Sequence, residues 1–317
     1  MELRKSHEHP IAPNIPDEWF VPKGKDMDEA EAVVRPSLSY WQDAWRRLLK
    51  NKLAMAGLIF LIILIFMAIF GPVISPHDFS EQKLVNQNQP PSSTHWFGTD
   101  ELGRDVFSRT WLGARISLFV GGVAALIDFV IGVIYGGIAG YKGGKADNAM
   151  MRFVEILYGL PYLLVVILIS VVMGPGLFTI IFALSVTGWV GMARIVRGQV
   201  LQIKNYEFVL ASKSFGARTS RIIKKNLLPN TMGPIIVQMT LTVPSAIFAE
   251  AFLSFLGLGI QPPFASWGSM ASDGLSSILT GHWWRLFFPA FFISLTMFSF
   301  NVLGDGLQDA LDPRLRR

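Results

Sequence analysis

Long runs without a charged side chain alternate along this 317-residue sequence with shorter segments rich in charge and in turn-forming residues. The hydrocarbon core of a bilayer is about 30 Å thick, so a helix needs about 20 apolar residues to cross it. Residues 53 to 76 carry no charge and predict a first transmembrane helix. Residues 116 to 141, interrupted only by Asp128, predict a second.

The longest uncharged run covers 38 residues between Glu155 and Arg194. As one helix it would be about 57 Å long, which exceeds the thickness of the membrane. The Gly-Pro-Gly sequence at residues 174 to 176 supplies a break near its middle, because proline cannot continue a helix and glycine tolerates a turn. This run therefore predicts the third and fourth transmembrane helices.

Two further apolar segments complete the pattern. From residue 226 to residue 272 the only charge is Glu250, and residues 286 to 304 have none, so they predict helices five and six. The fold class is thus an all-α integral membrane protein with six transmembrane helices. The expected segments are a flexible cytosolic tail (1–36), an interfacial amphipathic helix (37–52), the first transmembrane helix (53–76), an extracytoplasmic segment (77–112), a five-helix core (113–304) containing a polar loop (205–230), and a C-terminal end (305–317).

The Lys and Arg residues are distributed unevenly between the two sides of this topology. Of the 28, all but five (Lys83, Arg104, Arg109, Arg115 and Arg285) fall in the two terminal segments and in the loops at 142–152 and 194–225. Because cytoplasmic loops carry the excess of positive charge, both termini are expected to be cytoplasmic. The same asymmetry accounts for the net charge of +5, so no nucleic-acid role is expected.

Composition agrees with a protein that lives in lipid. Hydrophobic residues make up 51% of the chain and charged residues 16%, and the mean hydropathy is +0.42. No cysteine is present, which excludes disulfides, thiolate catalysis and cysteine metal sites. The first apolar run is too long for the core of a signal peptide and no small-residue cleavage site follows it, so we interpret it as a retained anchor.

The segment before the first apolar run is amphipathic. Before the first apolar run, SLSYWQDAWRRLLKNK places apolar residues at helical spacing beside basic ones, which favours a helix lying on the inner membrane surface over a plain extension of helix one.

Gly132, Gly136 and Gly140 form a small-residue face on the second predicted helix. Such faces allow helices to approach closely, and packing within the chain is preferred here to contact with another subunit.

The residue types needed for catalysis do not assemble into a known pattern. The histidines (His7, His9, His77, His95 and His282) form no H-E-x-x-H or Cys/His cluster, so no metal site is expected. The phosphate-binding pattern G-x-x-x-x-G-K-[ST] fails at Gly144-Lys145, because Ala139 and Ala146 occupy required positions. We therefore expect no catalytic residue, and any ATP that drives this protein must bind another chain.

Asp128 and Glu250 lie near the middle of the second and fifth predicted transmembrane helices, where an ionised carboxylate costs several kcal/mol. Such residues usually face a cavity or a partner. One interpretation is that they line a path for a solute. The alternative is a hydrogen-bonded polar contact between helices, and the sequence leaves both open.

The polar loop between helices four and five is basic and amphipathic. Phe208, Ala211 and Phe215 share one face of a first short helix, Gly216 permits a bend, and a second apolar stripe follows until Leu228-Pro229 is expected to stop it. Such an element either rests on lipid or fits a groove of a cytosolic partner.

Ala211, Gly216 and Leu228-Pro229 resemble the cytoplasmic EAA loop of ATP-binding-cassette (ABC) importer permeases, although the usual Glu-Ala-Ala reads Leu210-Ala211-Ser212 here. Three stretches resemble the C-type permease subunit of dipeptide and oligopeptide importers, so that the resemblance covers about residues 40 to 317. They are FGTDELGRDVFSR (97–109), AEAFLSFLGLGIQPPFASWG (249–268) and NVLGDGLQDALDPRL (301–315).

This resemblance implies a type I ABC importer permease bundle whose loop 205–230 carries coupling helices that dock on an ATPase. The implied partners are a B-type permease subunit in a heterodimer, two ABC ATPase subunits that hold ATP and Mg²⁺, an extracytoplasmic peptide-binding protein, and membrane lipid. The chain itself would bind no cofactor, and its location would be the cell membrane of a prokaryote. The implied ATPase-coupling residues are Glu207, Ala211, Ser212, Lys213, Gly216, Arg218, Leu228 and Pro229.

Two other functions remain open at this stage. Related permeases of the same architecture carry nickel or other small solutes. An ATP-independent secondary transporter or channel would instead use Asp128 and Glu250 as proton or ion sites.

Overall fold

Residues 39 to 312 are described by the computed structural model, and the predicted tail (1–36) lies outside them. The described residues form helices and no β-strand. The chain divides into two units within the first described helix, α2 (Tyr40–Lys50), and residues from Asp43 onward form the larger unit. Within that unit Ala44 and Leu48 of α2 are buried while Trp45 and Leu49 remain exposed, which suits the predicted surface helix.

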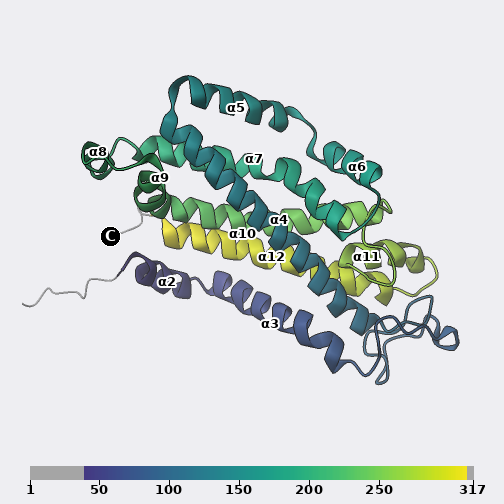
Figure 1. Cartoon of the computed structure of the whole chain (residues 1–317). Coiled ribbons are helices and arrows are strands. Elements are labelled where there is room, and N and C mark those ends of the chain that lie inside the picture. The colour runs from purple at the N-terminus through teal and green to yellow at the C-terminus, as the bar shows by residue number, and fades with distance from the viewer. Residues whose placement is uncertain (1–38, 313–317) are drawn as a thin grey trace, which may run out of the picture. The chain divides into compact units, whose positions relative to one another are not determined.

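The larger unit is a bundle of long helices joined by short ones (Figure 1). Within residues 39–312, five helices are long and apolar enough to cross a membrane, and a bent pair, α5 and α6, gives a sixth span if it is counted as one. The predicted all-α membrane fold is confirmed. The helices are α3 (Lys52–Ile74), α4 (Val106–Lys142), α5 (Gly144–Gly159), α6 (Tyr162–Met173), α7 (Leu177–Ile203), α8 (Glu207–Ser214), α9 (Thr219–Ile222), α10 (Leu228–Phe255), α11 (Trp267–Leu275) and α12 (Trp284–Leu311).

The longest uncharged run folds back at the predicted place, since α6 ends just before Gly174 and α7 begins just after Gly176. A second break was missed. Helices α5 and α6 meet at an angle of 79°, so the third span is not one straight helix. The residue before a proline disfavours the helical conformation, and Leu160, which precedes Pro161, is extended with ψ 134°.

Helix α4 differs in length from the second predicted helix. It has 37 residues and begins at Val106, inside the segment that was expected to be extracytoplasmic (77–112). Asp105 fixes this start, because its side chain accepts a hydrogen bond of 2.8 Å from the backbone N–H of Ser108. The first turns of α4 contain polar residues such as Arg109, so the hydropathy pattern did not predict them as part of the helix. Neighbouring elements bury these polar residues.

The small-residue face of α4 packs against α7. A Cβ atom added to Gly136 would lie 2.3 Å from the backbone carbonyl oxygen of Ala193, and one added to Gly140 would lie 2.9 Å from that of Arg197. One added to Gly132 would lie 2.6 Å from the Cβ atom of Met192 and 3.0 Å from the backbone nitrogen of Ala193. The predicted packing within the chain is therefore confirmed, and it brings two helix backbones into direct contact.

The end of the bundle away from α8 and α9 is held by ion pairs of two buried arginines. Arg104 lies 2.6 Å from Asp100, and Arg285 of α12 lies 2.9 Å from Glu101. Burial also raises the pKa of the nearby Asp273 carboxyl on α11. The stretch FGTDELGRDVFSR thus holds the connection between α3 and α4 against α11 and α12.

We predict that Gly136→Ala lowers the free energy of unfolding by about 1–3 kcal/mol, because the added methyl group overlaps a backbone atom that cannot move alone. Thermal unfolding of the purified chain in detergent measures this effect. Gly122→Ala is the matched control on the same helix, since nothing lies within 4 Å of a Cβ added there. Equal melting temperatures of the two variants would refute the close contact.

Candidate coupling loop and membrane cavities

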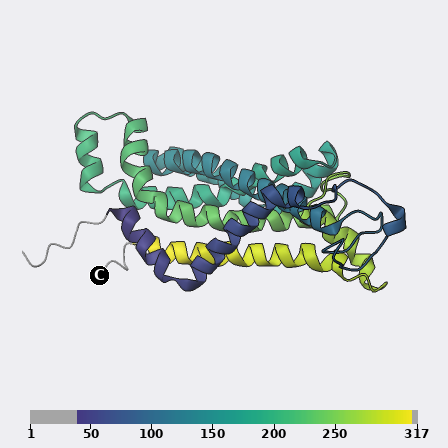
Figure 2. The same ribbon diagram turned by 90° about the horizontal axis from the view of Figure 1, so that it is seen from below.

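The connection between α7 and α10 projects from one end of the bundle as two short helices, α8 and α9 (Figures 1 and 2). Between them Gly216 has φ +73°, a left-handed conformation that glycine adopts without steric cost. Nothing lies within 4 Å of a Cβ added there, so backbone conformation alone favours glycine. The predicted pair of short helices with a glycine bend is confirmed.

Three buried aliphatic side chains anchor this loop to the bundle. Val209 of α8 is 2% exposed, and Ile222 and Leu227 are fully buried. They belong to one apolar cluster with Val133 of α4 and Val196 of α7. The loop is therefore packed on the membrane helices and is held there by about the burial energy of three aliphatic side chains, roughly 1.5–3 kcal/mol each.

The expected stop at Leu228-Pro229 is wrong. A π-helical turn, Ile223–Leu227, follows α9 directly and leads into α10, with the N–H of Leu228 bonded to the carbonyl of Ile223. Pro229 lies in the first turn of α10, where a missing N–H is tolerated. The loop and α10 are consequently one continuous helical element.

The other predicted coupling residues surround the glycine bend. Glu207 begins α8, and Ala211, Lys213 and Arg218 are exposed. Ser212 faces inward, and its hydroxyl oxygen accepts a hydrogen bond of 3.0 Å from the side-chain amide of Asn226. This contact fastens α8 to the π-helical turn. Leu228 is half-buried and Pro229 exposed at the base of the loop.

The coupling residues implied by the resemblance leave out the large exposed apolar side chains of the loop. Phe215 is 90% exposed immediately before the bend, and Phe208 and Leu210 are also exposed. Ala211 and Phe215 of the predicted apolar face therefore lie on the exposed side of the loop, because Val209 makes the inward contact instead. An exposed phenylalanine beside a helix-ending glycine is the signal that would have added Phe215 to the coupling residues.

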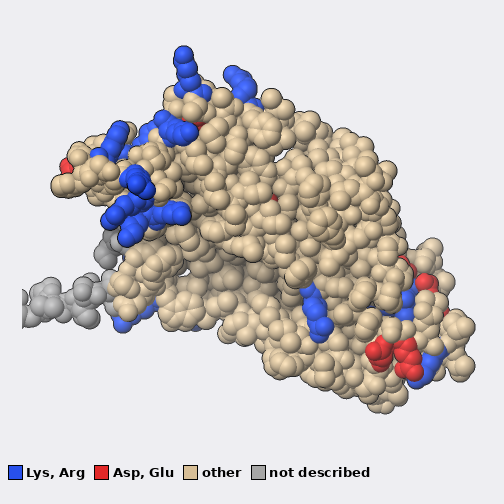
Figure 3. All heavy atoms as spheres, in the orientation of Figure 1, with Lys and Arg blue, Asp and Glu red and all other residues tan. Residues whose placement is uncertain are grey.

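Basic side chains gather at the same end of the molecule. Figure 3 shows Lys and Arg over α8, α9 and the adjoining end of the bundle, and acidic residues mainly over the opposite end. The basic residues of the loop are Lys213, Arg218, Arg221, Lys224 and Lys225. The exposed surface of the loop thus combines an aromatic side chain with positive charge. Such a surface is complementary to an acidic or amphipathic groove on another molecule.

Asp128 lines a cavity of about 510 Å³ between α4, α6, α7 and α10. Its side chain is 5% exposed, and its Oδ1 atom has no hydrogen-bond partner among residues 39–312. The remaining lining includes Tyr162, Thr187 and Thr242. A carboxylate in such surroundings is a strong candidate to meet a polar or cationic solute.

A second cavity, of about 780 Å³, lies nearer the loop. Glutamine side chains line it, together with Tyr206 and Phe208 at the base of α8. Gln238 and Leu241 of α10 line both cavities, so the two adjoin along that helix. The glutamines are Gln199, Gln202, Gln238 and Gln308.

Glu250 lies near the C-terminal end of α10, and not at the middle of a span as the sequence suggested. It is 0% exposed and accepts hydrogen bonds from the hydroxyl groups of Ser254 (2.7 Å) and Ser117 (3.1 Å). Neither cavity described above includes it. In this conformation Glu250 makes the interhelical polar contact that was the alternative interpretation.

These features define a multi-pass membrane protein with a projecting loop and polar cavities along one helix. Residues 132–317 match the family model described as binding-protein-dependent transport system inner membrane component, and residues 39–91 match the N-terminal TM domain of oligopeptide transport permease C. The chain belongs to this family of transport permeases.

Several curated relatives cover nearly the whole chain. The dipeptide transport system permease protein DppC of Bacillus subtilis is 77% identical over 96% of this chain and 95% of its own length. The oligopeptide transport system permease protein OppC of the same organism is 59% identical over 96% and 99%, respectively. OppC of Escherichia coli K12 is 45% identical over 88% and 92%.

The fold also resembles a solved ABC transporter. An inward-facing structure of the MetNI methionine ABC transporter aligns with a TM-score of 0.51 and 22% identity, covering 64% of this chain and 97% of that chain. At this identity the likeness concerns the fold alone. It agrees with the predicted ABC importer permease bundle.

Proposed function

We propose that this chain is a permease subunit of an ATP-driven importer of dipeptides and oligopeptides. Its 77% identity with a dipeptide permease over nearly the full length of both chains is the observation that carries the proposal. In this function the chain forms half of the translocation path and performs no covalent chemistry.

The coupling loop then docks on an ABC ATPase. Lys213 and Arg218 supply charge beside the glycine bend, and Phe215 offers an aromatic side chain to a pocket of the partner. ATP and Mg²⁺ bind two ATPase subunits, while a B-type permease subunit completes the path and an extracytoplasmic binding protein delivers the peptide. Both termini and the coupling loop lie on the cytoplasmic side, in agreement with the basic surface in Figure 3.

The adjoining cavities form this subunit's share of the translocation path. Asp128 places a carboxylate in the inner part of the bundle, where it attracts the free ammonium group that peptides of any sequence carry. Gln238 presents an amide that hydrogen-bonds to peptide groups without regard to side chain. Glu250 acts instead by joining α10 to α4 through Ser117.

We predict that peptide uptake depends on this chain and that the chain associates with ATPase subunits and a second permease. In the organism that encodes it, disruption of the gene should abolish uptake of radiolabelled dipeptides and oligopeptides, and restoration of the gene should recover it. A tagged chain extracted in mild detergent should co-purify with ATPase subunits and a second permease. Transport of peptide by the purified chain alone in vesicles would contradict the proposal and favour an ATP-independent transporter.

We predict that Gly216→Val leaves membrane insertion intact and lowers peptide uptake about tenfold. A β-branched residue in the left-handed region costs about 1–2 kcal/mol, which depletes the docking conformation of the loop by a similar factor. Gly216→Asn is the matched control, because asparagine tolerates positive φ and should retain most of the uptake. Equal uptake by the two variants would rule out a requirement for this backbone conformation.

We also predict that Phe215→Ala weakens association with the ATPase subunits by about 2 kcal/mol, or about 30-fold. The side chain is exposed, so the melting temperature of the isolated permease should not change. Phe178→Ala is the control, since Phe178 is also exposed but lies at the far end of α7. Titration of purified permease with ATPase subunits measures both variants, and matching affinities would exclude Phe215 from the docking surface.

A further inference from the structure

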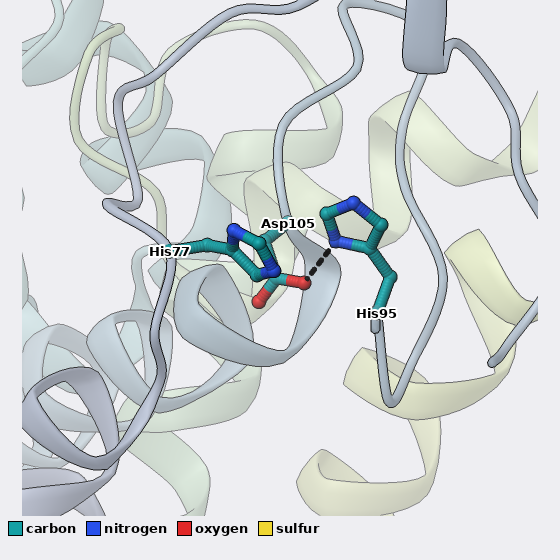
Figure 4. Close-up of side chains that lie close together, drawn as sticks. All are labelled: His77, His95 and Asp105. Carbon is teal, nitrogen blue, oxygen red and sulfur yellow. Dashed lines mark hydrogen bonds and ion pairs between the residues drawn. The ribbon is translucent and has the colours of Figure 1, made fainter. Parts of the chain in front are cut away.

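Three polar side chains from separate segments meet at the end of the bundle opposite the coupling loop (Figure 4). His77 follows the end of α3, His95 lies in the loop before α4, and Asp105 caps the first turn of α4. One nitrogen from each ring and one carboxylate oxygen all lie within 4.8 Å of one another. The sequence predicted no metal site because these residues form no motif until the chain folds.

His95 and Asp105 are held together by a hydrogen bond, and His77 lies against His95. Nδ1 of His95 lies 2.9 Å from Oδ1 of Asp105, and both side chains are buried. The ring of His77 stacks on that of His95 with 4.3 Å between centroids, and its Nε2 atom lies 3.0 Å from the carbonyl oxygen of Thr94. Figure 4 shows both rings beside the carboxylate.

The chemistry of this cluster fits a transition metal. Two imidazoles and one carboxylate are a common donor set for Zn²⁺, whereas Mg²⁺ and Ca²⁺ prefer oxygen ligands throughout. Ligands about 2.0–2.1 Å from a tetrahedral ion stand about 3.3 Å apart, close to the observed separation of the His95 nitrogen and the Asp105 oxygen.

The surroundings of the carboxylate support the same assignment. The second oxygen of Asp105 accepts hydrogen bonds from the backbone N–H of Ser108 (2.8 Å) and from the hydroxyl of Ser75 (3.4 Å). These bonds orient the carboxylate and leave Oδ1 directed at the histidines, as groups behind a metal ligand commonly do. His77 is only half-buried and lies in a loop, so it provides both an entry route and the freedom to close on an ion.

We propose that His77, His95 and Asp105 form a zinc-type metal site with a fourth position open to water. A bound ion would join the end of α3, the loop and the start of α4 at one point. It would thereby stabilise a connection that has little regular secondary structure between Ile74 and Val106. This site does not depend on the proposed transport function.

The test uses the full-length chain in lipid nanodiscs after removal of metal with a chelator. Because His7 and His9 could also bind metal, they are both replaced by asparagine in every sample. Zn²⁺ is titrated against a chromophoric competitor, and Co²⁺ is added separately to read the ligand geometry from its visible absorption. His77→Asn removes one ligand, and His282→Asn is the matched control at a histidine outside the cluster.

The expected result is one Zn²⁺ per chain in the background protein and in His282→Asn, with affinity lowered about tenfold or more in His77→Asn. Zn²⁺ should raise the melting temperature of the first two proteins only, and excess Mg²⁺ should not displace it. Absence of stoichiometric Zn²⁺ binding, or equal affinity in His77→Asn, would overturn the proposal. If His77→Asn failed to fold, a Co²⁺ spectrum of the background protein without tetrahedral bands would overturn it independently.

Discussion

The close approach of α4 and α7 is the contact on which the rest of the structure depends. Gly132, Gly136 and Gly140 let the two backbones touch, which no residue with a side chain would permit without displacing α7. In a membrane, where lipid is as apolar as the helices, such packing supplies much of the force that holds helices together. The same pair of helices forms walls of the cavity at Asp128 and contributes Val133 and Val196 to the anchor of the coupling loop.

The coupling loop divides its apolar residues between two tasks. Val209, Ile222 and Leu227 are buried against the bundle and fix where the loop stands. Phe215 faces outward among basic side chains. Because the two sets of residues are separate, the loop is anchored to the bundle and still exposes an apolar side chain that a partner can bind. A loop that buried all its apolar residues would be stable but would expose no apolar surface for a partner to bind.

Hydrophobic runs predicted the membrane helices well, because a chain in lipid must bury its backbone polar groups in helices of a fixed minimum length. The glycine bend was equally readable, since few other residues adopt positive φ. The break at Leu160-Pro161 was missed because it lies inside the long uncharged run, where the hydropathy pattern shows no boundary. Pro229 was misread because a proline stops a helix or starts one according to its position, which only the fold decides. The meeting of His77 with Asp105 likewise depends on tertiary structure.

Helix α10 contains two internal prolines, Pro234 and Pro244. Each deletes one hydrogen bond of the helical ladder, so flexing there costs less than elsewhere. Gln238, Leu241 and Thr242, which line the cavities, all lie between them. A displacement that enters α10 through the π-helical turn therefore meets a first hinge before it reaches these residues and a second beyond them. The segment between the two prolines, which lines the cavities, can therefore move relative to the C-terminal end of α10, where the hydrogen bond between Glu250 and Ser117 holds the helix to α4.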